Sequence, residues 1–260
     1  KPVGIPQQEG RGAGIILSRP DRGVAAGMVL RMPYLGIALF LILIAFIISR
    51  LKLPSFTGAT RPDTATAPSF KSVFMFRNLR FGILGIFAYV GAEVAIGSFL
   101  TNYVADTLDI REKAANHYVS FYWGGMLVGR LLGSVILKKV RPPVVLAFTA
   151  SCAILLILFS VNTHGYAAVW SMVLVGVCNS VMFSIIFSLA VKGLGVHTSA
   201  ASGILSTAIT GGAVVSLLVG ITRDHSSWAA AFMLPVLCYG CILFYALNGY
   251  RQGRFGAEKM

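Results

Sequence analysis

Long apolar runs separated by short polar segments fill most of the chain. About 20 apolar residues suffice to cross the ~30 Å hydrocarbon core of a bilayer as a helix. We expect seven such spans, at residues 33–49, 81–104, 119–137, 144–161, 167–191, 200–221 and 229–247. Composition agrees, because 56% of the residues are hydrophobic and only 12% are charged, which is too apolar for a soluble domain. The sequence therefore predicts an all-α, multi-pass membrane protein.

Basic residues are concentrated in alternate loops, which explains the formal net charge of +13. The positive-inside rule then places the segment 50–80, the loop 138–141 and the carboxy terminus in the cytoplasm. Among the loops between spans, those on the opposite side carry only Arg111, Lys113 and Arg223. No amphipathic basic face with interleaved aromatic residues is present, so we expect no nucleic-acid partner.

Composition also suggests boundaries along the chain. We expect an atypical amino-terminal tail at 1–32, a lone helix at 33–49, a Pro/Thr/Ala-rich cytoplasmic linker at 50–79, a six-helix bundle at 80–250 and a cytoplasmic tail at 251–260. The amino-terminal tail is basic, although the topology places it outside, where few basic residues are expected. It has neither an initiator Met nor the apolar region of a signal peptide. We therefore interpret the sequence as part of a longer protein. A weakly inserted or reversed first span is the alternative.

Groups that could support catalysis are scattered. The cysteines lie inside predicted spans, where small apolar packing is the favoured interpretation, and the histidines lie in loops or at span ends. The sequence offers no paired acid and base, nucleophile or metal cluster at membrane depth. We expect neither an enzyme nor a bound metal or cofactor.

Of the chain's nine carboxylates, Glu93 is the one that lies within a long apolar run, GILGIFAYVGAEVAIGSFL. Inserting a charged side chain at the centre of a membrane helix costs about 2.5–3.5 kcal/mol on insertion scales. Such a residue marks a functional site by default, and here it points to a translocation pathway.

Small residues repeat at intervals of four in two spans. Gly125, Gly129 and Gly133 share one helix face in 119–137, and a similar stripe of small residues runs from 212 to 220. Such stripes allow close backbone approach, so we expect a tight helix contact at each. Arg130 adjoins the first stripe and is either a gate that forms an ion pair or a side chain that extends to the cytoplasmic interface.

Several sequence blocks resemble a known family. YVGAEVAIGSFLTNY, YVSFYWGGMLVGRLLGS, FSIIFSLAVKGLG and SGILSTAITGGAVV are similar to the second half of the fucose, glucose and galactose permeases of the major facilitator superfamily, from about residue 76 to 251. PYLGIALFLILIAFIISRLKLP resembles the last helix of the first half. GRLLGSVILKKVR resembles the superfamily's loop motif between helices 8 and 9. The resemblance therefore covers helices 6 to 12 of a twelve-helix transporter.

The resemblance implies import of a monosaccharide together with protons across the bacterial inner membrane. Two six-helix halves would alternate access to a central cavity that helices 7, 8, 10 and 11 line. Sugars are held by carboxylate and amide groups and by aromatic rings. The candidate sugar contacts on these helices are Glu93, Asn102, Tyr103, Tyr122, Trp123, Asn179 and Phe183.

Most of these candidates also have a structural interpretation. Asn102 and Tyr103 lie near the outer end of their span and could anchor it at the interface. Tyr122 and Trp123 could face lipid, and Phe183 could simply pack.

Glu93 and Asn179 are the polar candidates nearest the middle of their spans. Asn179 is as well suited to an interhelical hydrogen bond as to a sugar contact. For Glu93 we favour sugar binding over proton coupling, because the coupling carboxylates of the fucose permeases are thought to lie in the first half. Pairing with a cation of that half is a third interpretation.

Helices 1 to 5 of the family pattern are outside this sequence, so we do not expect the chain alone to transport. The expected partners are a monosaccharide, a proton and the lipid bilayer. One alternative is an exporter of another small molecule. Another is a non-transporting fragment that assembles with a separate first-half chain. In addition, Ser216 stands where the family pattern suggests proline, which would remove a kink from that helix.

Overall fold

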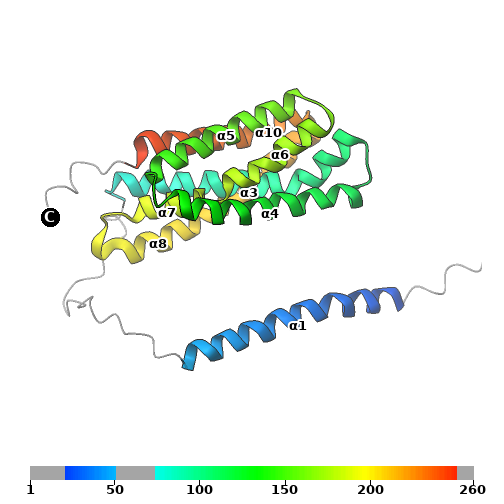
Figure 1. Ribbon diagram of the computed structural model, residues 1–260, viewed down its shortest axis with the longest axis horizontal. Coiled ribbons are helices and arrows are strands. Elements are labelled where there is room, and N and C mark those ends of the chain that lie inside the picture. The colour runs from blue at the N-terminus through cyan, green and yellow to red at the C-terminus, as the bar shows by residue number, and fades with distance from the viewer. Residues whose placement is uncertain (1–20, 51–73, 251–260) are drawn as a thin grey trace, which may run out of the picture. The chain divides into compact units, whose positions relative to one another are not determined.

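The computed structural model describes residues 21–50 and 74–250, which belong to two separate units. The described part of the first unit is one helix, α1, which runs Asp21–Arg50 (Figure 1). It includes the predicted span 33–49 and extends further toward the amino terminus. Its apolar stretch is Tyr34–Ile47. The predicted linker 50–79 lies largely outside the described residues.

In the second unit, residues 74–250 form six helices long and apolar enough to cross a membrane. They are α3 (Arg77–Leu108), α4 (Glu112–Ile136), α5 (Pro142–Asn162), α6 with α7 (Gly165–Asn179 and Met182–Val191), α8 with α9 (Thr198–Thr207 and Gly211–His225), and α10 (Trp228–Phe244) continued by a π-helical turn at Tyr245–Gly249. The connections alternate between the two ends of this unit (Figure 1). The described residues contain no strand, so the predicted all-α fold is confirmed.

Helix α3 is the central element of the six-helix unit. It contacts α4, α6, α7, α9 and α10, and much of its middle is buried, with Ile86, Ala92 and Ile96 fully covered. By contrast, Leu131 of α4 and Leu217 of α9 are more than 60% exposed. Such apolar surface faces acyl chains in a bilayer, where it costs nothing to leave it uncovered by protein.

The predicted glycine stripes lie at helix contacts, as expected. Gly129 and Gly133 of α4 face Ser180 and Val181, where α6 ends and α7 begins. A Cβ on Gly129 would lie 2.5 Å from the Ser180 hydroxyl oxygen. A side chain at this position would therefore push α4 away from the α6–α7 segment.

Two of the six spans are interrupted, which the sequence pattern did not predict. The span 167–191 breaks at Ser180 and Val181, between α6 and α7. The span 200–221 changes to a 3-10 turn at Ala208–Thr210, between α8 and α9. A mid-span 3-10 segment often marks a hinge or a functional position. The helix of this span is therefore interrupted before Ser216, and the interruption forms without a proline at position 216.

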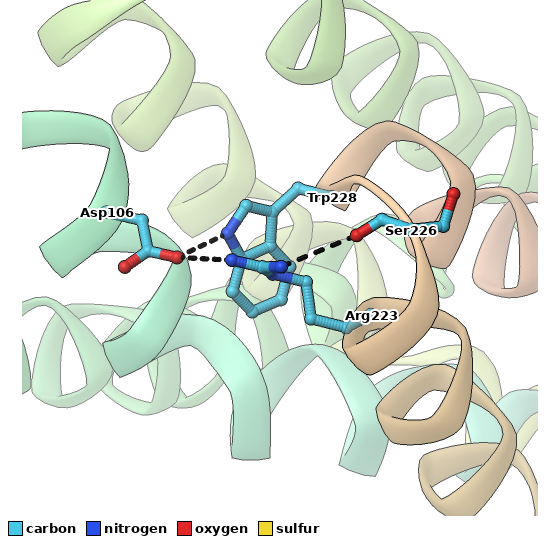
Figure 2. A network of polar contacts seen from close by, with 4 residues as sticks. All are labelled: Asp106, Arg223, Ser226 and Trp228. Atoms are coloured by element: carbon cyan, nitrogen blue, oxygen red, sulfur yellow. Dashed lines mark hydrogen bonds and ion pairs between the residues drawn. The ribbon is translucent and has the colours of Figure 1, made fainter.

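A polar network joins three helices at the end of the unit opposite the start of α3 (Figure 2). An Arg223 guanidinium nitrogen lies 2.8 Å from Oδ2 of Asp106, and the Trp228 indole nitrogen donates to the same oxygen at 2.9 Å. The Arg223 guanidinium also lies 4.6 Å from the centre of the Trp228 ring. An exposed ion pair alone contributes little, but the indole hydrogen bond and the cation–π contact add to it. The network connects α3, α9 and α10.

The packing of α9 on α3 generates a test at Gly211. A Cβ there would overlap the backbone carbonyl of Phe87, whereas a Cβ on Gly203 of α8 meets nothing within 4 Å. We expect Gly211→Ala to lower the free energy of unfolding by about 1–3 kcal/mol, because backbone cannot yield as a side chain can. The melting temperature of the purified protein in detergent would measure this effect.

Gly203→Ala is the matched control, and we expect it to leave the melting temperature unchanged or slightly raised. Equal melting temperatures for the two variants would contradict the close α3–α9 approach.

Candidate functional site

A pocket of about 370 Å³ lies where both interrupted spans meet α3 and α4. Its lining residues are Tyr89, Val90 and Glu93 of α3, Arg130 of α4, Ser180, Phe183 and Ser184 at the α6–α7 break and in α7, and Ile209 of the 3-10 turn. This volume is in the range of small-molecule sites. Discontinuous membrane helices commonly form the binding sites of transporters, because their irregular backbone can line a cavity.

The α6–α7 break leaves backbone carbonyls without helical partners, and two side chains of the pocket bond to them. The Tyr89 hydroxyl donates to the Asn179 carbonyl at 3.0 Å. Nε of Arg130 donates to the Ser180 carbonyl at 3.3 Å. Each unsatisfied backbone group at membrane depth costs several kcal/mol. Tyr89 and Arg130 therefore stabilise the break and also line the pocket.

Opposite charges face the same pocket. Glu93 is half-buried and Arg130 is exposed, and both line the pocket. The Phe183 ring lies beside that of Tyr89, with ring centres 6.1 Å apart. The pocket thus offers a carboxylate acceptor, a cationic donor and an aromatic wall.

A buried amide network lies behind the pocket. Asn179 is fully covered. Its Nδ2 donates to the Tyr122 hydroxyl at 2.9 Å, and its Oδ1 accepts from the Tyr239 hydroxyl at 2.7 Å. The Tyr122 hydroxyl in turn donates to the backbone carbonyl of Glu93 at 3.3 Å. This network joins α3, α4, α6 and α10 next to the Glu93 backbone.

The structure brings three of the sequence-predicted residues into the pocket, namely Glu93, Phe183 and Arg130. Tyr122 and Asn179 lie one layer behind it. For Asn179, the interhelical hydrogen bond that we considered beside a sugar contact is present.

The other three predicted residues lie away from the pocket. The Tyr103 hydroxyl is buried against Ser160, 2.8 Å from its Oγ. Asn102 is exposed, and Trp123 is 45% exposed with its ring edge against Tyr122.

Sequence analysis missed several residues that line the pocket. Tyr89 precedes Glu93 by one helical turn, so it lies on the same face of α3, and this spacing could have identified it. Ser180 follows Asn179 directly. Two adjacent residues whose side chains compete for backbone hydrogen bonds are a weak signal of the break.

An all-helical membrane unit with a polar pocket at two interrupted spans is typical of a transporter. Residues 13–217 match the family model of the Major Facilitator Superfamily, so the chain belongs to this family. It is a multi-pass protein of a family of membrane transporters rather than enzymes, and the family resemblance identified in the sequence is confirmed.

Individual members of the family are also similar to this chain. The chain is 42% identical over 219 residues to the glucose/galactose transporter of Brucella abortus (strain 2308), covering 83% of this chain and 52% of the relative. It is 28% identical over 213 residues to the L-fucose-proton symporter of Escherichia coli (strain K12), covering 79% and 48%. A crystal structure of the transporter FucP in the outward conformation matches with a TM-score of 0.81 and 26% identity, over 91% of this chain and 59% of that chain. The chain spans about half the length of these curated relatives.

The buried amide network generates a second test. Asn179→Ala removes the acceptor of the Tyr239 hydroxyl and the donor to Tyr122, leaving buried polar groups unpaired. We expect the free energy of unfolding to fall by about 1–3 kcal/mol, measured as a lower melting temperature in detergent.

Asn102→Ala is the matched control, since the Asn102 side chain is exposed and its loss should cost less than about 0.5 kcal/mol. If both variants melted together, the Asn179 amide would not hold the four helices as the structure indicates.

Proposed function

We propose that this chain forms the sugar-binding half of a secondary transporter that imports a monosaccharide of the glucose, galactose or fucose type together with protons. The relatives named as glucose/galactose transporters and as an L-fucose-proton symporter support the substrate class. The observation that carries the proposal is the pocket at the two helix interruptions, in which a carboxylate, a guanidinium and aromatic rings face one small volume.

Within this proposal each side chain has a chemical role. The Glu93 carboxylate accepts hydrogen bonds from sugar hydroxyl groups. The Phe183 ring packs on the apolar face of the sugar. Arg130 acts as a gate, because its guanidinium already bonds to the backbone of the α6–α7 break and can exchange this bond for one to the sugar or to Glu93.

Tyr122 and Asn179 support the site from behind, by holding the backbone of Glu93. Proton carriage by Glu93 is the second role that its position allows.

The proposal also includes an orientation and a location. The positive-inside rule favours a cytoplasmic carboxy terminus, and the bacterial relatives favour the inner membrane. Alternating access in this family uses two halves that rock around a midplane site. The chain supplies one six-helix unit, and the first half is either part of the same protein or a separate chain.

Uptake of labelled glucose, galactose and fucose by transport-deficient cells tests the proposal. The cells would express this chain alone, or this chain joined to the first half of the Brucella transporter. We expect uptake from the joined protein. Glu93→Gln in it should reduce uptake about tenfold or more, because hydrogen bonds to charged groups contribute about 1.5–3 kcal/mol.

Glu112→Gln is the matched control, since this carboxylate is exposed at the start of α4 and outside the pocket. Uptake equal to that of the unmodified joined protein is expected for it. A joined protein that reaches the membrane but moves none of the three sugars would refute the substrate class and favour an exporter. Full uptake with Glu93→Gln would assign Glu93 a structural role. Uptake by the chain alone would show that a first half is not required.

A further inference from the structure

Two serine hydroxyls in the Glu93 pocket have no hydrogen-bond partner among the described residues. Ser180 lies at the α6–α7 break and Ser184 in the first turn of α7, and both line the pocket. Ser180 is 5% exposed, and Ser184 is exposed. The side of the α6–α7 segment that meets the pocket therefore presents two hydroxyls that a ligand could bind.

Other hydroxyls in the two interrupted spans are used by their own helices. Those of Ser188, Thr207 and Thr210 each donate to the carbonyl three residues earlier, at 2.7–3.0 Å. Serine and threonine commonly bond to the local backbone in this way. A polar group at membrane depth without any partner is costly. The two pocket serines are therefore expected to bond to whatever fills the pocket.

The serines add a kind of hydrogen bonding that the charged groups of the pocket lack. The Glu93 carboxylate can only accept and the Arg130 guanidinium can only donate, whereas a serine hydroxyl does both. The Tyr89 hydroxyl, the third hydroxyl of the pocket, already donates to the Asn179 carbonyl. A sugar hydroxyl is also both donor and acceptor. Each serine can therefore pair with a sugar hydroxyl in either orientation.

We propose that Ser180 and Ser184 bind sugar hydroxyl groups and make the Glu93 pocket select a fully hydroxylated hexose over analogues of the same sugar that lack one hydroxyl. This inference rests on the proposed function. A site built to hydrogen-bond a substrate hydroxyl rejects an analogue without it, because the polar groups of the site are then left unpaired. Glu93 thus provides affinity for a sugar, and the serines decide which sugar is accepted.

Competition for sugar uptake by the joined protein described above tests the proposal. The competitors are the unlabelled form of the sugar that is taken up and analogues that each lack one of its hydroxyl groups. We expect at least one analogue to compete about threefold to tenfold less well than the complete sugar. Ser180→Ala or Ser184→Ala should weaken the complete sugar by a similar factor and leave that analogue unchanged, because the analogue already lacks the lost hydrogen bond.

Ser188→Ala is the matched control. This serine is also exposed and lies on α7 one turn beyond Ser184, but its hydroxyl donates to the Ile185 carbonyl and it is outside the Glu93 pocket. We expect it to change neither affinity by more than about twofold. The ratio of the two affinities does not depend on the amount of folded protein, so a folding defect cannot imitate the expected result.

Two results would overturn the inference while the proposed function stands. One is sugar uptake whose affinity is unchanged in both serine variants. The other is equal weakening of the complete sugar and of every analogue, which would make the serines structural. A joined protein that reaches the membrane and moves none of the three sugars would refute the proposed function, and this inference with it.

Discussion

The structure depends on one constraint, which is that backbone carbonyls at membrane depth must find partners inside the protein. The α6–α7 break places the Asn179 and Ser180 carbonyls in this position, and Tyr89 and Arg130 bond to them. Those partners can reach the break only if α3 and α4 approach it closely. Gly129 and Gly133 permit this approach on the α4 side. The glycine stripe, the break and the pocket therefore depend on one another.

The same constraint explains why polar groups lie inside an otherwise apolar core. Tyr122, Asn179 and Tyr239 satisfy one another behind the pocket, so none of them needs water. A site for a hydroxyl-rich molecule needs polar groups that are held in place before the ligand arrives. The buried network supplies that rigidity, because Tyr122 also bonds to the backbone of Glu93.

The fold was largely predictable because hydrophobic length alone identifies membrane helices. All six spans of the second unit appear close to the predicted limits, and the Gly129–Gly133 contact followed from spacing. The site was predictable in part: Glu93 and Arg130 are charged residues within apolar runs, and Phe183 is an aromatic residue on a helix that the family resemblance places at the cavity. The α6–α7 break was missed, since no proline or glycine marks Ser180 and Val181. Asn102 and Tyr103 were selected by residue type, but side-chain type does not show which face of a helix meets a pocket.

The polar residues of α3 hold this helix to its neighbours and leave the Glu93 carboxylate facing the pocket. Near its start, Asn78 donates to carbonyls at the end of α7. Near its end, Asp106 accepts from Arg223 and Trp228. These contacts hold α3 at both ends, and Tyr89 holds it to the α6–α7 break. The Glu93 side chain lies between them and faces the pocket. Because the other contacts already position the helix, the Glu93 carboxylate is not required to hold α3 in place, in keeping with its proposed role in sugar binding.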